Sequence, residues 1–339
     1  MAARLGIGVV GLGRMGAMHA RFVARAVSGA KVVAVADADR DRARAMGAEL
    51  DVANIFGSTA ELAACPAVDA VLLATPSARH PEDVVAAASA GRDVLCEKPL
   101  SLDVAGSEAA LAAVAKAGVR LQVGLMRRHD PDYQRAARRL ADGVVGRPVL
   151  FKSLQFDPEP PPPAFCDRAV SGGIFLDMGI HEFDLARWLM GDEVVEVHAW
   201  GSTAGVPELA SVGDYDSAVV NLRFARGGTG AVEMARTADY GEDVRTEVVG
   251  SGGSVFIGRL PASQGAYGTR GTLTVDAVDP SEMRFQAAYA AQVQAFVRSL
   301  AEDLPVTPTG EDALVALRIS LAARASAERG GPVAVGTAR

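Results

Sequence analysis

Lys98, in the stretch Glu97-Lys98-Pro99, is the residue of this sequence best suited to chemistry. It is one of four lysines in a chain whose Lys and Arg residues number 34, so the other thirty are arginines. Lysine is a compact charge whose pKa shifts on desolvation, and it hydrogen-bonds a reacting oxygen without a planar fork. The alternative interpretation is a surface lysine in front of a proline turn.

The apolar run Val94-Leu95-Cys96 directly precedes this lysine and indicates a short buried strand of an α/β sheet. Ligands of such sheets bind beyond the carboxyl ends of the strands. We therefore expect Lys98 to lie at the ligand-binding edge of the sheet.

A dinucleotide fingerprint, Gly11-Leu12-Gly13-Arg14-Met15-Gly16, follows an apolar strand and opens a helix. Gly11 permits a tight turn, Gly13 lets the backbone approach a pyrophosphate, and Gly16 lets the helix and strand pack closely. The pyrophosphate then lies on the free amides at the positive end of the helix. The alternative is a glycine-rich turn that binds no ligand.

Asp37 lies at the end of the second expected strand, 21 residues after Gly16. A carboxylate at this place accepts hydrogen bonds from the ribose hydroxyls of adenosine, and it repels a 2′-phosphate. The sequence therefore predicts NAD as the cofactor, while Arg40 nearby leaves NADP open.

Asp177 and His181 form a second pair with chemical potential. Their spacing of four residues places both on one face of a helix, and a histidine held by a carboxylate acts as a general base near neutral pH. Two other interpretations stay open. One is a core histidine satisfied by Asp177, and the other is a metal-binding pair, although no further Cys or His has matching spacing. We predict no metal site.

The first 124 residues, which must position the fingerprint and Lys98, alternate between strands and helices. Strands are expected at 5–10, 31–36, 70–74, 92–96 and 121–124, and helices at 15–27, 40–50, 80–90 and 101–118. This alternation predicts an α/β fold, a Rossmann domain with a doubly wound parallel sheet.

The pattern changes after residue 124 to longer, often alternating strands joined by glycine turns. Strands are expected at 149–155, 193–201, 216–224, 229–236, 245–250 and 254–257, helices at 287–301 and 311–328, and a stiff proline-rich loop at 157–163. This pattern predicts an α+β domain with a large open, mainly antiparallel sheet. The predicted domains are therefore 1–124 and 125–339.

Composition narrows the function further. The chain has 339 residues and a net charge of −7, which argues against nucleic acid or an anionic membrane as the main partner. There is no cleavable signal and no apolar run long enough to span a membrane, so we expect neither secretion nor membrane insertion. Cys65, Cys96 and Cys166 are odd in number and lack metal-type spacing, which suits a reducing cytoplasm.

Taken together, the motifs resemble those of the glucose–fructose oxidoreductase / inositol dehydrogenase (Gfo/Idh/MocA) family over nearly the whole chain. The resemblance rests on the fingerprint, Thr75-Pro76 with His80, Glu97-Lys98-Pro99, and Asp177-x-x-x-His181. Within the family the chain most resembles the inositol 2-dehydrogenases. The stretches that carry this closer resemblance are 124–130, Asp157-Pro158, Ser171-Gly172-Gly173, and Tyr240 before 247–250.

The resemblance implies a role for each motif. Lys98, Asp177 and His181 would form the catalytic triad. The substrate would contact this triad together with Met126, Arg127, Asp157 and Tyr240. The cofactor would contact Gly11, Leu12, Gly13, Arg14, Met15, Gly16, Asp37, Thr75, Pro76, His80, Glu97 and Lys98. One departure is His129, where relatives usually carry Phe or Tyr; its polar ring would either alter which cyclitol fits or face solvent.

The implied reaction is the NAD-dependent oxidation of a ring hydroxyl of myo-inositol or a stereoisomer to the inosose by hydride transfer. The resemblance also implies a cytoplasmic homodimer or homotetramer that pairs through the second domain. Alternative substrates are an aldose, an anhydrosugar or an aminocyclitol, and the same fold supports NAD-dependent glycoside hydrolysis without net NADH. A further alternative is a non-enzymatic NAD-sensing regulator, since fold alone does not fix function. The intact catalytic triad argues against that last alternative.

Overall fold

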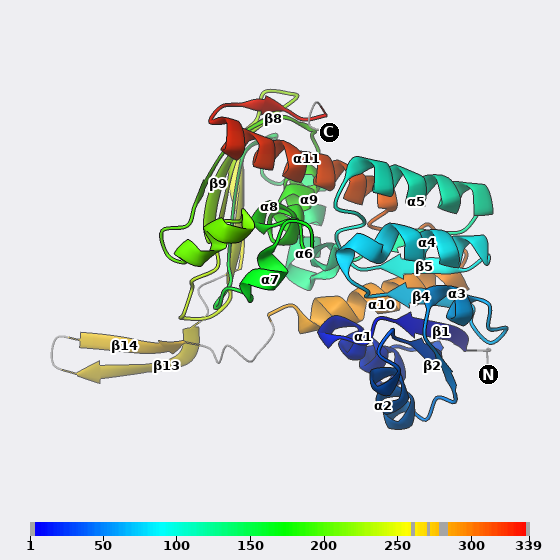
Figure 1. The fold of residues 1–339 in the computed structure, drawn as a ribbon. Helices are drawn as coiled ribbons and strands as arrows, with labels where there is room; N and C mark the ends of the chain where they lie inside the picture. The colour runs from blue at the N-terminus through cyan, green and yellow to red at the C-terminus, as the bar shows by residue number, and fades with distance from the viewer. Residues whose placement is uncertain (1–3, 259–261, 270–271, 278–283, 337–339) are drawn as a thin grey trace. The chain divides into compact units, whose positions relative to one another are not determined.

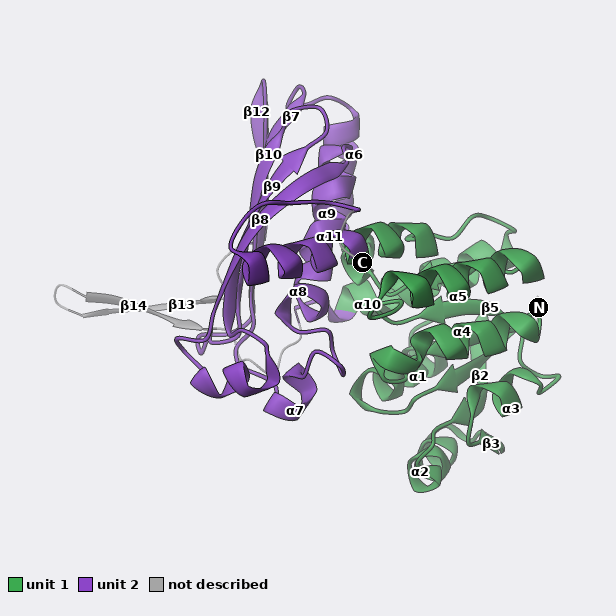
Figure 2. Cartoon of the chain, turned by 45° about the horizontal axis from the view of Figure 1, so that its top comes forward, with its two compact units in different colours: residues 1–130, 287–317 green, residues 131–286, 318–339 purple. Residues whose placement is uncertain are grey.

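The structure, a computed structural model, describes residues 4–258, 262–269, 272–277 and 284–336 (Figure 1). The extreme ends of the two predicted domains, 1–3 and 337–339, lie outside the described residues. The chain divides into two compact units (Figure 2). The first comprises Met1–Asp130 and Ala287–Leu317, and the second comprises Pro131–Gln286 and Arg318–Arg339.

The first unit is built on a six-stranded parallel sheet in the order β3-β2-β1-β4-β5-β6. Its strands are β1 (Leu5–Val10), β2 (Ala30–Ala36), β3 (Asn54–Phe56), β4 (Ala70–Leu73), β5 (Asp93–Cys96) and β6 (Leu121–Val123). The strand order reverses between β1 and β4, and doubly wound folds bind ligands beyond the carboxyl ends of the strands at such a point. The predicted Rossmann domain is therefore confirmed.

Three helices of this unit, α2, α3 and α5, begin at side chains that cap them. Asp39, Ser58 and Asp103 each accept a backbone N–H two or three residues further on, which stabilises a helix by about 1 kcal/mol. The α-helices are α1 (Arg14–Arg25), α2 (Arg40–Leu50), α3 (Thr59–Ala63), α4 (His80–Ser89), α5 (Val104–Ala117) and α10 (Gln286–Ala301). Two short 3₁₀ helices are η1 (Ser77–Arg79) and η2 (Met126–His129).

The division of the chain differs from the predicted 1–124 and 125–339. The first unit extends to Asp130, and Ala287–Leu317 returns to it from the far end of the sequence. The reason is hydrophobic packing, because Val293, Phe296 and Val297 of α10 share one buried cluster with Val23 of α1. Which sheet a C-terminal helix covers is a tertiary property that its own periodicity does not reveal.

The second unit is built on a seven-stranded sheet in the order β12-β11-β7-β10-β9-β8-β15. The strands are β7 (Pro148–Phe156), β8 (Val194–Ser202), β9 (Ser217–Phe224), β10 (Thr229–Ala235), β11 (Asp243–Gly250), β12 (Gly253–Ile257) and β15 (Val333–Ala334). Every neighbouring pair is antiparallel except β7 and β10, which run parallel. The prediction of a mainly antiparallel open sheet is therefore confirmed.

In the described part of the second unit, helices cover one face of this sheet and leave the other open. Along β9, side chains alternate between buried and exposed, as in a strand with one covered face. Helix α9 packs on β7 and β10. The helices of this unit are α6 (Pro131–Ala141), α7 (Pro163–Cys166), α8 (Ile174–Asp177), α9 (Gly179–Met190), the 3₁₀ helix η3 (Pro207–Val212) and most of α11 (Gly310–Arg329). Strands β13 (Ala262–Thr269) and β14 (Thr272–Ala277) pair with each other in a separate two-stranded sheet.

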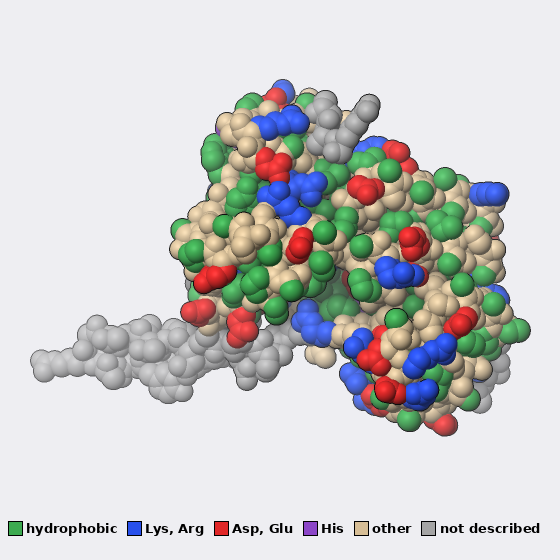
Figure 3. All heavy atoms as spheres, in the orientation of Figure 1, with side chains coloured by type: hydrophobic (Ala, Val, Ile, Leu, Met, Phe, Trp, Pro, Cys, Tyr) green, Lys and Arg blue, Asp and Glu red, His purple; other side chains and the backbone are tan. Residues whose placement is uncertain are grey.

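Surface charges are interspersed and locally paired. On α2, Arg44 pairs with Asp41 at 2.6 Å and Arg42 with Asp39 at 3.5 Å, and Figure 3 shows acidic and basic side chains intermixed over this helix. Exposed pairs of this kind contribute about 0–1 kcal/mol each, so they serve solubility more than stability. Among the described residues, no helix is long and apolar enough to cross a lipid bilayer.

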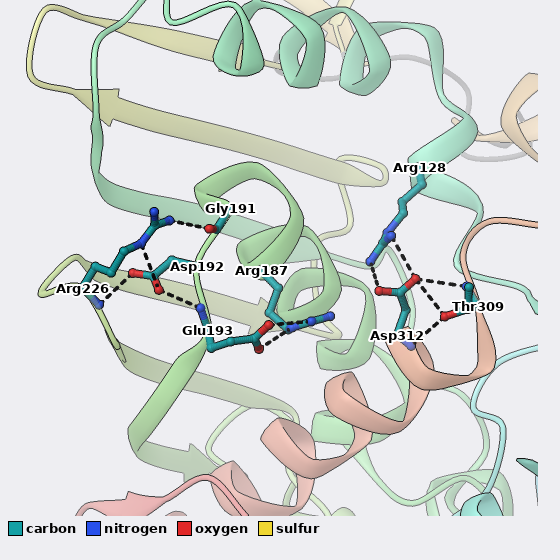
Figure 4. Close-up of polar contacts among 8 residues, drawn as sticks. All are labelled: Arg128, Arg187, Gly191, Asp192, Glu193, Arg226, Thr309 and Asp312. Atoms are coloured by element: carbon teal, nitrogen blue, oxygen red, sulfur yellow. Dashed lines mark hydrogen bonds and ion pairs between the residues drawn. The ribbon is translucent and has the colours of Figure 1, made fainter.

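His129 is buried and holds η2 to a distant segment of the first unit. Its Nε2 lies 3.0 Å from the carbonyl oxygen of Thr307. The neighbouring Arg128 pairs with Asp312 at 3.1 Å, and Asp312 accepts the N–H of Thr309 (Figure 4). The imidazole of His129, at the position where the resembling proteins carry Phe or Tyr, is therefore not exposed to solvent. It holds η2 to the turn at Thr307 in the first unit.

A similar fastening closes the end of α9 in the second unit. Arg226 donates to the carbonyl of Gly191, and its backbone N–H donates to Asp192 at 2.9 Å (Figure 4). Gly191 ends the helix in the left-handed conformation, with a φ of +57°. Arg187 of the same helix pairs with Glu193 at 2.7 Å. These contacts fix the C-terminal end of the helix that carries His181.

We expect His129 to make the first unit sensitive to acid. Burial lowers the pKa of His129 from 6.5 to about 4 against the opposing hydrogen bond to Thr307. As the pH falls, His129 is therefore protonated in the unfolded chain before it is protonated in the folded protein. The contribution of His129 to the free energy of unfolding is complete above pH 6.5 and is lost as the pH drops toward 4, with a loss of about 2 kcal/mol at pH 5. In His129→Gln, whose amide still donates to Thr307 but does not titrate, the fall in Tm between pH 7.5 and pH 5 should be smaller.

Thermal unfolding at the two pH values, followed by circular dichroism, measures this difference. At pH 7.5 the variant and the parent protein serve as each other's control, since the His129 imidazole is neutral there. An equal fall in Tm for both proteins would mean that His129 does not carry the acid sensitivity.

Candidate functional site

The glycine turn after β1 has the shape of a phosphate cradle. Gly11 has a φ of +80°, and a Cβ there would lie 2.5 Å from the carbonyl oxygen of Ala74. A Cβ at Gly16 would lie 1.7 Å from the carbonyl oxygen of Gly11, so the turn, α1 and the end of β4 touch through backbone. A Cβ at Gly13 would meet no described atom within 4 Å, which leaves room above the turn.

The start of α1 is open to an anion. Gly13 is its N-cap, no described side chain caps it, and its first turn contains no acidic residue. Its amides and the positive end of its dipole are therefore available to a pyrophosphate. Arg14 and Met15 form the first turn of this helix and directly follow Gly13, next to the open space at that glycine.

Asp37 is buried at the end of β2 and braces the same turn. Its Oδ2 accepts the N–H of Leu12 at 2.7 Å, and its Oδ1 accepts the N–H of Asp39 at 2.8 Å. Arg42 lies 3.4 Å from Oδ2, whereas Arg40 pairs instead with Glu61 at 3.6 Å. The arginine beside Asp37 is therefore Arg42, and not Arg40, which the sequence analysis named as the nearby arginine.

The turns after β4 and β5 are joined by His80. Its Nε2 lies 2.8 Å from the carbonyl oxygen of Thr75, and its Nδ1 lies 2.6 Å from that of Pro99. Burial lowers the pKa of His80, although the two carbonyls oppose this shift. The hydroxyl of Thr75 donates to Asp83 at 2.7 Å. His80 and Thr75 thus fix Pro76 and the residue after Lys98 in one rigid assembly.

Glu97 connects Lys98 to the helix of the fingerprint. Its Oε1 lies 2.7 Å from Nε2 of His19 in α1, and its Oε2 accepts the N–H of Lys98 at 3.1 Å. Burial opposes ionisation, yet the hydrogen bond from His19 and the charge of Lys98 lower the pKa of Glu97. A Cβ at Gly124 would lie 2.8 Å from Oε2, so that position also accommodates this carboxylate.

His19 was missed by the sequence analysis. Its signal was its place three residues after Gly16, on the buried side of α1. A polar ring on an apolar helix face needs a partner, and only the fold shows that the partner is Glu97.

The predicted cofactor residues and Lys98 all lie beyond the carboxyl ends of β1, β2, β4 and β5. Met126 and Arg127 lie in η2, just after β6, and both are buried. The parallel sheet thus brings these residues to one edge of the first unit.

In the second unit, the parallel pair β7 and β10 brings together one predicted site residue, Asp157, and one residue that the sequence analysis did not predict, Arg236. The two strands end side by side at Phe156 and Ala235, so Asp157 and Arg236 directly follow at the same edge. The N–H of Asp157 donates to Ala235 at 2.8 Å, and its Oδ1 accepts from Gln155 at 3.1 Å.

Asp177 and His181 do not lie on one continuous helix, so that expectation is wrong. Helix α8 ends at Asp177, and α9 begins at Gly179. The N–H of His181 reaches the carbonyl of Met178 at 3.3 Å, only three residues back. Gly179, the first residue of α9, is closely packed, since a Cβ there would lie 2.8 Å from the ring of Phe183. His181 is buried in the first turn of α9.

Arg236 is a second residue that the sequence analysis missed. It follows β10 directly and is fully buried, and its Nη1 lies 3.2 Å from Oδ2 of Asp177. The signal available in the sequence was a charged residue at the end of a strand whose alternate residues are apolar.

Tyr240 lies between β10 and β11, at the same edge of the second sheet. Its hydroxyl donates to Oδ2 of Asp243 at 3.0 Å, and Asp243 also accepts from Arg245 at 2.9 Å. Desolvation and the neighbouring Asp243 raise the pKa of Tyr240. The phenol is therefore a neutral donor at physiological pH. In the described part of the chain, no group of three or more His, Cys, Asp or Glu side chains is arranged to hold a metal ion.

Comparison with known families gives two matches that together cover most of the chain. Residues 5–125 match the Gfo/Idh/MocA oxidoreductase family with its NAD-binding Rossmann fold, and residues 133–256 match the family's C-terminal domain. Two similar curated proteins are named for inositols. The chain is 37% identical to scyllo-inositol 2-dehydrogenase (NAD(+)) of Bacillus subtilis, over 96% of this chain and 94% of that protein. It is 38% identical to myo-inositol 2-dehydrogenase of Thermotoga maritima, over 95% and 96%.

Solved structures agree with this assignment of the fold. A probable dehydrogenase from Thermotoga maritima has a TM-score of 0.94 and 36% identity, over 99% of this chain and 100% of that one. A scyllo-inositol dehydrogenase from Lactobacillus casei, solved with NAD(H) and scyllo-inositol, has a TM-score of 0.91 and 29% identity, over 98% and 100%.

We expect Asp37→Ser to weaken NAD binding and to improve the binding of NADP. The change removes the carboxylate that would bond the ribose hydroxyls and repel a 2′-phosphate, and a lost charged hydrogen bond corresponds to about a tenfold or greater change. Fluorescence titration with NADH and NADPH measures the ratio of the two dissociation constants.

Asp39→Asn is the matched control, because it removes a nearby exposed carboxylate while keeping an oxygen to cap α2. Its ratio should match that of the parent protein. A ratio unchanged in Asp37→Ser would show that Asp37 does not reach the ribose.

Proposed function

Since the chain belongs to the Gfo/Idh/MocA family of oxidoreductases, whose Rossmann domain binds NAD, we propose that it oxidises a ring hydroxyl of a cyclitol. The substrate is myo-inositol or a stereoisomer, and the product is the corresponding inosose. The observation that carries this proposal is the combination of Lys98, held by Glu97 at the cofactor edge, with the buried His181, which lies four residues after Asp177 in the next helix. The inositol substrates of the similar proteins support it.

The chemistry assigns a task to each of the three residues. Bound NAD accepts the hydride from the carbon that carries the hydroxyl. His181 takes the hydroxyl proton as general base, and Asp177 favours the imidazolium that results. Lys98 donates a hydrogen bond to the substrate oxygen and stabilises its alkoxide character as the hydride leaves. One proton and one hydride leave the substrate, which balances its conversion to a ketone.

We propose that Met126, Arg127, Asp157 and Tyr240 contact the remaining ring and hydroxyls of the substrate. Arg127 and Tyr240 supply donors, Asp157 supplies an acceptor, and Met126 supplies an apolar surface for the ring. A polyol offers both donors and acceptors, so a site with both kinds of group suits it. The contacts of Asp157 with Gln155 and of Tyr240 with Asp243 hold these two side chains in place.

We further propose that the chain forms a homodimer or homotetramer through the uncovered face of the second sheet. Trp200 and Phe256 lie on this face and are 50% and 72% exposed, and Val219 is the cross-strand neighbour of Trp200. Large exposed apolar side chains on one sheet face are typical of a contact surface. The three cysteines are free thiols, which suits our proposal that the protein works in the reducing cytoplasm.

The first test follows NADH by absorbance with NAD and a panel of compounds. The panel holds myo-, scyllo- and D-chiro-inositol, glucose, xylose and an aminocyclitol. We expect NADH formation with at least one inositol, at a higher kcat/KM than with either sugar. Activity with a sugar or the aminocyclitol but with no inositol would contradict the proposed substrate. No NADH with any compound would contradict the proposed reaction.

The catalytic assignment is tested with His181→Ala and Lys98→Ala. Loss of a general base typically costs about 10²–10⁴ in rate, and we expect each variant to lose kcat on this scale while NADH still binds. Lys116→Ala, at an exposed lysine in the last turn of α5, is the control and should keep full activity. Near-normal kcat in either site variant would exclude that residue from the chemistry.

A further inference from the structure

Arg236 is a fully buried cation between two carboxylates. Its exposed fraction is 0%, and its Nη1 lies 3.2 Å from Asp177 while its Nη2 lies 3.3 Å from Asp214. Burying a charge is costly unless it is paired and hydrogen-bonded. One carboxylate is enough to neutralise the guanidinium charge. The presence of a second carboxylate therefore needs a separate explanation.

Asp214 is fitted into this place by the glycines before α8. Its Oδ1 accepts the N–H of Ile174 at 2.8 Å, at the start of α8. Gly173 has a φ of +75°, and a Cβ there would lie 2.6 Å from the same oxygen. Only a glycine permits this approach, which gives the Ser171-Gly172-Gly173 stretch a physical role. Burial raises the pKa of Asp214, against the hydrogen bond from Ile174 and the charge of Arg236.

The group formed by Asp177, Asp214 and Arg236 carries a net charge of −1 when all three are ionised. Other ionisable groups lie around it. Arg168 passes Gly213 and Gly173, lies over the ring of Tyr215, and pairs with Glu328. Cys166 is buried, which raises its pKa, so its thiol stays neutral. Asp177 is therefore paired with Arg236, and Arg236 is paired in turn with Asp214.

We propose that Arg236 and Asp214 are positioning residues that set the proton affinity of His181. They do so by controlling how much of the negative charge of Asp177 is neutralised by Arg236 and how much is left to stabilise protonated His181. This inference rests on the proposed function only in taking His181 as the base. The guanidinium and an imidazolium compete for Asp177. Asp214 draws part of the guanidinium charge away, which leaves more of the Asp177 charge to stabilise protonated His181.

The proposal makes opposite predictions for the two residues. Asp214→Asn keeps the acceptor for Ile174 but removes a negative charge, so the pKa of His181 should fall. Arg236→Met removes the positive charge, so that pKa should rise. Nearby charges shift a pKa by about one unit or more, so each change should be of this size. The double variant restores a net charge of −1, and its His181 should titrate close to the parent value.

The measurement is an NMR titration of the histidine rings in the full-length protein without ligand. The chain has only five histidines, and the His181 signal is identified by its loss in His181→Gln. Arg223→Met, at an exposed arginine of β9 that pairs with Glu196, is the charge-matched control and should leave His181 unchanged. Because the readout is a pKa, it stands even if no inositol is oxidised, so failure of the proposed function is recognised separately.

Shifts of opposite sign that cancel in the double variant support the proposal. An unchanged pKa in Asp214→Asn, or shifts of the same sign in both single variants, overturns it, because loosened packing alone has no charge dependence. If Arg236→Met does not fold, the shift in Asp214→Asn, measured against the Arg223→Met control, decides the matter: a fall in the pKa of His181 supports the proposal, and no fall overturns it. In the active enzyme, the acid limb of the pH profile of kcat/KM should move in the same direction as the pKa.

Discussion

The buried hydrogen bond between His19 and Glu97 is the contact on which the arrangement of the first unit's site depends. It joins the helix of the glycine turn to the end of β5, two elements that the chain itself separates by three strands. Because Glu97 also holds the N–H of Lys98, the position of the lysine backbone follows from the position of α1. The helix of the glycine turn and the backbone of Lys98 are thus held in one rigid arrangement.

The second unit also brings predicted site residues to one edge of its sheet, but it does so through a single pair of parallel strands. Its sheet is antiparallel apart from β7 and β10, and that one parallel pair puts two strand ends at one edge. Asp157 and Arg236 leave the sheet there, and Arg236 reaches Asp177 in the broken helix. Met178 separates α8 from α9, so His181 lies in the first turn of a new helix. Both units therefore place predicted site residues where parallel strands end.

Much of the fold could be predicted because its signals are local. Apolar runs and glycine turns gave the order of the main strands, and the fingerprint with Asp37 predicted an NAD-binding Rossmann domain, which the family match confirms. Two elements, β3 with three residues and α3 with five, are too short for a periodic pattern to reveal them, and the arginine-rich α6 buries only a narrow face. His19 and Arg236 could not be assigned from sequence, because each is explained only by a partner that lies far away along the chain. The roles of the named site residues stay predictions.

The hydrogen bond from Leu12 to Asp37 has a consequence for how this protein can change. The carboxylate that we expect to bind the ribose also accepts a hydrogen bond from the glycine turn, so the expected cofactor preference and the integrity of the turn depend on one side chain. A lineage that exchanges NAD for NADP must supply a new acceptor for the Leu12 amide in the same step, or accept a looser turn. Small hydroxyl residues meet that requirement and aliphatic ones do not, which narrows the routes open to natural divergence at position 37.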